Sequence, residues 1–202
     1  MKHAITLLAA GFLSCPLLCG AEGPPAKSVA ISTGQVASFE VNFSRVTGAA
    51  TGAAIAGLVG AAIQEGKHTK DDAAKTREVA TKLAHPECDT PMIRAATDAL
   101  VAGGFAIDDA GAGARAVLFI QDCGLRLTDR SSDVVAAFVN VRLEYSPPGA
   151  AKPTWKEDIT ITGREQRAYS EFAKQDGLAQ HELDETLKRA GVRVANKIIY
   201  QK

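Results

Sequence analysis

The most regular pattern along the chain is an alternation of apolar and polar residues between positions 115 and 162, which predicts three strands. The alternation is cleanest in 134–145 and again in 155–162, and a Pro-Pro-Gly turn separates these two segments. In the first segment, 115–127, we expect one face to carry Val117, Phe119, Cys123, Leu125 and Leu127. Strands that follow one another through short turns predict an antiparallel meander.

Two segments outside the predicted meander carry apolar residues at helical spacing. The closing segment, 178–199, begins after Asp176, a candidate cap, and places these residues on one face: Leu183, Leu187, Ala190, Val194 and Ile198. The segment 91–102 follows Thr90, which we expect to cap it, and a Gly-Gly pair ends it. Both helices must bury an apolar face, and the sheet supplies the surface. The sequence therefore predicts an α+β fold.

The remaining predicted elements are shorter or less regular. Alternation predicts strands at 29–31, 37–43 and 105–107. Sparse apolar residues at helical spacing predict a helix over 71–83. None of these elements changes the predicted fold class.

The first 21 residues have the layout of a secretory signal peptide. Lys2 and His3 give a basic start, and residues 4–18 form an apolar run that is short for a bilayer span. Residues 19–21 are Cys, Gly and Ala, and they supply the small side chains that a signal peptidase recognises. We expect cleavage after Ala21 and export to a bacterial periplasm.

Two cysteines in this segment leave a second interpretation open, in which the chain receives a lipid. Cys15 follows Leu13 and Ser14 as in a lipoprotein signal, but Phe12 stands where Leu is usual, and Cys19 fits less well. A lipid on Cys15 would hold the protein at a membrane surface, whereas cleavage further along would release it. We favour cleavage.

The segment 48–64 is uncharged and rich in glycine and alanine. Gly48, Gly52, Ala56 and Gly60 recur every fourth residue, so one helix face has almost no side chains, which is typical of a glycine zipper. This pattern predicts self-association, contact with an envelope protein partner, or contact with a membrane. The simpler alternative is a helix packed on its own domain.

The chain thus divides into a signal peptide (1–21), a lead-in with the first strand (22–47), the zipper segment (48–64) and the remainder of a single α+β domain (65–202).

Two cysteines, Cys88 and Cys123, remain after the predicted cleavage. In an oxidising compartment an isolated pair is most simply a disulfide. Two free thiols are an alternative, and so is a metal site that would add His85 and a further ligand. Because nothing in the spacing demands a metal, we predict neither a metal nor a cofactor.

Charge and motifs exclude several classes of function. The chain has 23 basic and 23 acidic residues, and this neutrality argues against a nucleic-acid partner. The segment 60–67 lacks the spacing of a phosphate-binding loop, and 111–116 precedes a predicted strand where a dinucleotide motif would follow one. We find no nucleophile elbow and no zinc-hydrolase motif, so we predict no catalytic residue.

The order of parts resembles a class of poorly characterised exported bacterial envelope proteins, many of them lipoproteins. The resemblance is carried by Gly48, Gly52, Gly60 and the strands described above, and it implies an envelope-associated protein without catalytic activity. The leading hypothesis is therefore a non-enzymatic envelope protein that acts by interaction, assembly or membrane association. The alternative is a periplasmic enzyme or thiol-redox protein that uses Cys88, Cys123 and His85.

Overall fold

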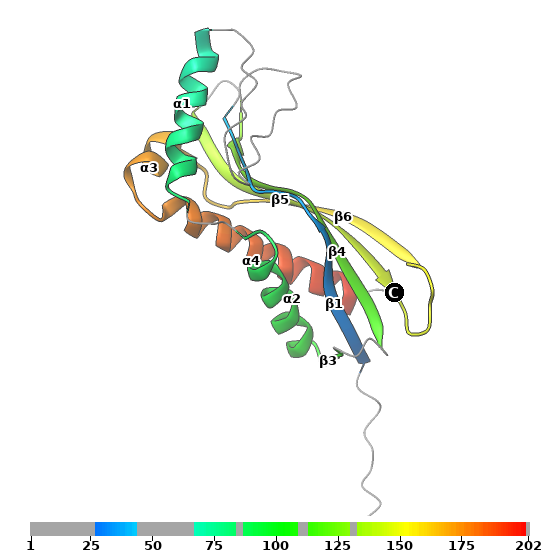
Figure 1. Ribbon diagram of the computed structural model, residues 1–202. Coiled ribbons are helices and arrows are strands. Elements are labelled where there is room, and N and C mark those ends of the chain that lie inside the picture. Colours follow the sequence, from blue (N-terminus) through cyan, green and yellow to red (C-terminus); the bar gives the residue numbers. More distant parts are fainter. Residues whose placement is uncertain (1–26, 44–66, 84–86, 109–112, 130–132, 201–202) are drawn as a thin grey trace, which may run out of the picture.

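The computed structural model describes residues 27–43, 67–83, 87–108, 113–129 and 133–200, which Figure 1 draws as coloured ribbon. Within these ranges the chain forms a seven-stranded sheet and four helices. The helices are α1 (Lys67–Thr81), α2 (Thr90–Ala102), α3 (Tyr169–Lys174) and α4 (Leu178–Ile199). The predicted α+β class is confirmed.

The predicted antiparallel meander forms one side of the sheet. It consists of β4 (Ala114–Leu127), β5 (Val134–Ser146) and β6 (Trp155–Thr162), in that spatial order. Val141 of β5 pairs with Ile120 on one side and with Ile159 on the other, so the apolar positions of the three strands are in register.

The early strands extend this sheet in a way that the sequence pattern did not predict. Both β1 (Lys27–Val36) and β2 (Glu40–Asn42) run parallel to β4 on the side opposite β5, and β3 (Phe105–Ile107) runs parallel to β1. A two-residue strand, β7 (Arg167–Ala168), pairs with the start of β5. The sheet is therefore mixed, and its strand order is β3-β1-β4-β5-β6.

Helices α2 and α4 lie together on one face of the sheet (Figure 1). All five predicted apolar positions of α4 are buried. The predicted caps are wrong at both helices. Asp89 caps α2 by accepting from the Thr90 N–H at 2.8 Å, so Thr90 is already helical. At α4 the cap position belongs to Gly177, whose φ is +80°, and Asp176 instead forms an ion pair with Lys82.

The long strands β4 and β5 change direction near their middle, and the sheet bends there (Figure 1). In β4 the register shifts between Ile120 and Asp122, and the neighbouring chain is interrupted between β1 and β2 at the same height. Beyond β5, the chain is interrupted between β6 and β7. We call β1, β3, β6, α2 and α4 the lower half, and β2, β7, α1 and α3 the upper half, while β4 and β5 run through both.

The bend also changes which residues of β4 face the helices. Even-numbered residues from Ala114 to Ile120 are buried before the bend, and Cys123 and Leu125 are buried after it. The prediction that Val117 and Phe119 share a face with Cys123 is therefore wrong. An irregularity in the ladder shifts the two-residue period by one position, so Val117 and Phe119 lie on the opposite face, where they are half-buried.

The close packing of α2 against α4 depends on one glycine in α4. Gly191 of α4 lies so near α2 that a Cβ atom there would stand 2.2 Å from the carbonyl oxygen of Met92. Only a residue without a side chain lets the two helices approach this closely. Met92 and Leu100 of α2 and Leu187 of α4 are fully buried in the shared core.

Candidate functional site

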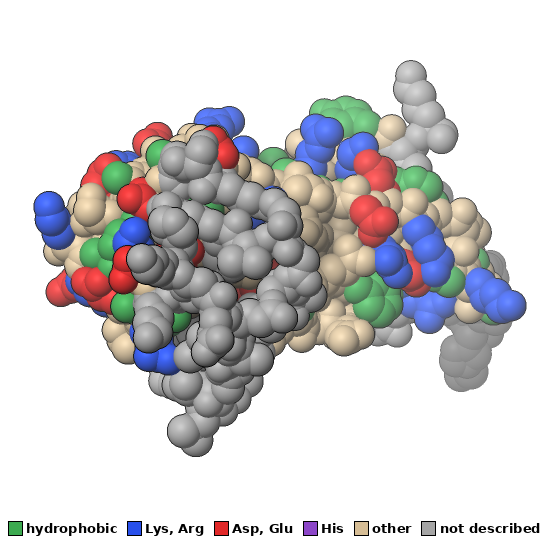
Figure 2. Space-filling view, turned by 90° about the horizontal axis from the view of Figure 1, so that it is seen from above, with side chains coloured by type: hydrophobic (Ala, Val, Ile, Leu, Met, Phe, Trp, Pro, Cys, Tyr) green, Lys and Arg blue, Asp and Glu red, His purple; other side chains and the backbone are tan. Residues whose placement is uncertain are grey.

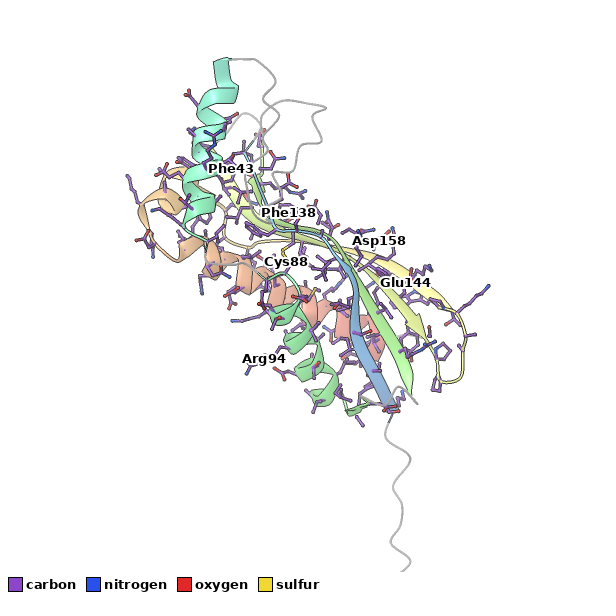
Figure 3. All side chains as sticks on the ribbon, in the orientation of Figure 1. Phe43, Cys88, Arg94, Phe138, Glu144 and Asp158 are labelled. Atoms are coloured by element: carbon purple, nitrogen blue, oxygen red, sulfur yellow. A yellow bond between two sulfur atoms is a disulfide. The ribbon has the colours of Figure 1, made fainter. Side chains whose placement is uncertain are left out.

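The structure joins Cys88 and Cys123 in a disulfide. Cys88 lies just before α2, and Cys123 lies in β4 directly above the bend, on the face toward the helices (Figure 3). The bond therefore ties the start of α2 to the point where the sheet changes direction. Cys88 is 3% exposed and Cys123 is fully buried.

This burial bears on the thiol-redox hypothesis. Thiol–disulfide exchange requires a thiolate to reach one of the two sulfurs, and neither sulfur here has an exposed approach. His85, the third member of that hypothesis, lies outside the described residues. Within the described ranges, no three His, Cys, Asp or Glu side chains converge as metal ligands.

Several sequence-predicted features lie outside the part of the chain that the structure describes. They are the signal peptide (1–21), the lipidation candidate Cys15 and the zipper residues Gly48, Gly52, Ala56 and Gly60. Among the described helices, none is both long enough and apolar enough to cross a membrane.

A cluster of charges links the upper half to α4. Arg167 of β7 donates from Nε to Glu182 at 3.2 Å and also reaches Glu171 and Glu165. Glu182 is only 5% exposed, so its hydrogen bond to Arg167 satisfies a carboxylate that is almost fully buried. This bond is the main reason that the pKa of Arg167 is raised. Three carboxylates thus accept hydrogen bonds from the Arg167 guanidinium, and we interpret the cluster as structural.

An open groove runs between β6 and α4 and encloses about 600 Å³. Its floor contains Ile161 of β6 and Val192 of α4, and Val192 is 43% exposed. Five cationic residues line it against two acidic ones, Glu157 and Asp158, and the Asp158 side chain pairs with Arg142. The cations are Arg164, Lys188, Arg189, Arg193 and Lys197.

One wall of the groove is a sheet edge, because β6 pairs with β5 and with no other strand that the structure describes. The Gly163 N–H donates to the Ala137 carbonyl at 2.7 Å, and this bond shows which residues next to it in β6 bond to β5. Since paired and unpaired residues alternate in an antiparallel ladder, the odd-numbered residues of β6 direct their N–H and C=O groups toward β5. The even-numbered residues direct theirs toward the groove: Lys156, Asp158, Thr160 and Thr162.

A side-chain contact agrees with this assignment. Arg189 of α4 donates from Nη1 to the Thr162 carbonyl at 3.3 Å, so that carbonyl does point away from β5. The contact occupies one end of the edge. The Asp158 and Thr160 backbone groups have no backbone partner on that side among the described residues.

Some cations of the groove already pair with an acidic side chain, and others do not. Lys197 pairs with Glu157, and Lys188 pairs with Glu185 at 2.7 Å. The hydrogen bond from Lys188 lowers the pKa of Glu185, and the same bond raises the pKa of Lys188. Arg164 and Arg193 form no ion pair with any residue that the structure describes. The groove thus retains an excess of positive charge.

The opposite face of the sheet is different in character. There, Arg142 pairs with Asp158 at 3.1 Å and Lys156 pairs with Glu144 at 2.6 Å, each across neighbouring strands. Glu144 and Asp158 project away from α4 in Figure 3, and Figure 2 shows cationic and acidic side chains interspersed beside the grey residues. The charges within each of these two pairs cancel locally.

Sequence reasoning did not identify the groove. Only the apolar face of the closing segment was interpreted, although Arg189, Arg193 and Lys197 recur there at four-residue spacing. That spacing predicts a ridge of cations on one side of a helix. The sequence did not indicate that this ridge lies beside an edge strand, because strand order depends on long-range pairing.

Comparisons with known proteins find distant structural likeness only. No family model and no curated protein matches the chain. A solved structure from Xanthomonas campestris, described as belonging to DUF330, is 9% identical with a TM-score of 0.45, and the match covers 86% of this chain and 84% of that one. A protein from Caulobacter crescentus described as a lipoprotein is 16% identical (TM-score 0.39), covering 57% of this chain and 80% of that one.

A minor lipoprotein from Acinetobacter baumannii is similar at the same level. It is 17% identical with a TM-score of 0.40, and the match covers 57% of this chain and 84% of the other. Likeness this distant carries no argument about what the present chain binds or does, so the function must be argued from its own residues.

Proposed function

We propose that this chain is a non-enzymatic protein of the bacterial cell envelope that is exported and acts by binding another envelope component. The observation that carries the proposal is the open cationic groove beside the unpaired edge of β6. It combines free backbone groups, an apolar floor and an excess of one charge, which are the features of a surface built for contact.

Two features support export. The first 21 residues have a signal-peptide layout, and the buried Cys88–Cys123 bond requires an oxidising compartment to form and persist. Together they favour the periplasm. In this proposal the zipper residues Gly48, Gly52, Ala56 and Gly60 are a second contact element, through self-association or contact with a membrane.

The test uses the full chain in a bacterial host, with a photo-cross-linking residue in place of Val192 in the groove. Val101, an exposed valine on α2, is the matched control because it is 55% exposed and lies outside the groove. We expect a processed protein in the envelope fraction and a cross-linked adduct with an envelope component from position 192 but not from 101. The Arg193→Glu change should remove the adduct.

Three results would contradict the proposal. The protein could remain in the cytoplasm with two alkylatable thiols, it could give no adduct at 192, or it could give equal adducts at both positions. Mass spectrometry of the adduct identifies the partner and separates a defined contact from random capture.

A further inference from the structure

We propose that the groove binds an extended acidic peptide segment, which adds to the sheet as a strand beside β6. The inference rests on the proposed function and names its partner class. An added strand requires free backbone donors and acceptors at a sheet edge, room for the incoming chain, and side-chain contacts that select a sequence. The groove supplies all three.

The backbone groups come from the even-numbered residues of β6. Asp158 and Thr160 direct an N–H and a C=O into the groove, and the Thr162 carbonyl accepts from Arg189 at 3.3 Å. An incoming strand would bond to Asp158 and Thr160 in the spacing of an ordinary ladder. The Arg189 contact marks the end at which pairing stops.

The length of the site is set by α4. The cationic ridge from Arg189 to Lys197 covers eight helical rises, which is about 12 Å. A strand rises about 3.3 Å per residue, so the ridge faces about four residues of an added strand. The site therefore recognises a short segment.

The charge of the occupant follows from the side chains that the added strand would meet. Successive residues of a strand point to opposite faces, so every second residue of the incoming segment would face α4. There it meets Arg193, which lacks an ion pair among the described residues, and Arg189 beside it. Carboxylates at alternate positions would form charge-assisted hydrogen bonds with these arginines. The apolar floor at Val192 and Ile161 would be covered by the same strand.

A membrane surface is the competing occupant for a cationic site. Two observations favour a peptide. The arginines line a groove whose opposite wall is a strand edge, and backbone groups at that edge match a peptide better than a lipid headgroup. The open sheet face beside the groove carries paired charges of both signs and gives no broad cationic surface for anionic lipid.

The test measures binding of a labelled seven-residue peptide with glutamate at alternate positions to the mature full chain. Arg193→Glu should weaken binding at least tenfold. Arg77→Glu is the matched control, because it changes an exposed arginine on α1 by the same charge far from the groove and should leave binding within twofold. Thr160→Pro removes one edge N–H that does not pair with β5, and should also weaken binding at least tenfold.

Methylation of the peptide backbone tests the strand without altering the protein. In an added strand, alternate amides face β6 and the others face solvent. Methylating one alternate set should abolish binding, and methylating the other should leave it within about threefold. Equal effects of the two sets would overturn strand addition, and so would equal losses for the Arg193 and Arg77 variants.

Vesicles of phosphatidylglycerol test the competing occupant. The inference is overturned if the vesicles bind in an Arg193-dependent manner while the peptide does not bind. It is also overturned, with the proposed function left standing, if position 192 cross-links to an envelope component that lacks an acidic extended segment. Loss of both the adduct and peptide binding would contradict the two proposals together.

Discussion

The two halves of the molecule share β4 and β5 but are stabilised in different ways. In the lower half, α2 and α4 pack on each other and on the sheet, and the contact is close enough to require Gly191 beside Met92. In the upper half, α1 and α3 are smaller contributors to the core, and several of their contacts are polar, such as the ion pair of Lys75 with Asp133. The groove therefore lies on the better-packed half, and the core holds one of its walls, α4, in place.

Disruption of the lower half should have the largest effect. Leu187 of α4 is fully buried, and Leu187→Asp would place an unpaired charge between α4 and the sheet. We expect a loss of at least about 4 kcal/mol in the free energy of unfolding, measured by urea denaturation. Val192→Asp on the exposed side of the same helix is the control for loss of helix propensity. A Leu187→Asp protein as stable as the parent would contradict the packing of α4.

The disulfide joins the halves at the bend, and its removal should have the next largest effect. The two cysteines are 35 residues apart, so the bond restricts a loop of that size in the unfolded chain. The double change Cys88→Ser and Cys123→Ser should cost about 4 kcal/mol, and reduction of the parent should reproduce it. Thermal unfolding with and without reductant measures the effect. If reduction leaves the unfolding temperature unchanged, the bond does not stabilise the fold.

The same substitution in each half compares them directly. Val194 of α4 and Val79 of α1 are both fully buried. Val194→Ala should cost about 2 kcal/mol in global stability, from lost apolar burial and the cavity left behind. Val79→Ala should cost less and should mainly increase local opening of the upper half, which limited proteolysis of α1 would detect. Equal global losses without added protease sensitivity would remove the distinction between the halves.

Alkaline pH should affect the upper half by a smaller amount. Burial raises the pKa of Tyr169 from about 10 to about 12, and its hydrogen bond to the Glu78 carboxylate acts in the same direction. A pKa raised on folding means that the stabilisation is fully present below pH 10 and is lost as pH rises toward 12. Ultraviolet titration should find a phenol with this late pKa, and Tyr169→Phe should remove it. A parent protein whose phenols all titrate near pH 10 would contradict this environment.

Sequence pattern predicted some elements of the molecule well and others poorly. Period-two alternation in β5 and β6 and the helical stripe of α4 predicted these three elements, because each pattern is set by one buried face. The predictions are wrong where local pattern and long-range pairing differ. The bend in β4 moved Val117 and Phe119 to the other face, and parallel pairing of β1 with β4 left no local signal.

The candidate site could not be predicted from the sequence for the same reason. Arg189 and Arg193 are visible as a cationic ridge, but their position beside the edge of β6 depends on the strand order of the whole sheet. The pair Cys88 and Cys123 could be singled out by composition and compartment alone, because no other cysteine remains after the predicted signal peptide.

The most direct test of the account is backbone amide exchange along β6, residue by residue, with and without the acidic peptide. In the free protein, the amides of Ile159 and Ile161 should be protected by β5, while those of Asp158 and Thr160 should exchange freely from the open edge. Saturating peptide should slow Asp158 and Thr160 by at least about tenfold and leave Ile159 and Ile161 unchanged. Protection of Asp158 and Thr160 in the free protein, or fast exchange at both with the peptide bound, would contradict strand addition at this edge.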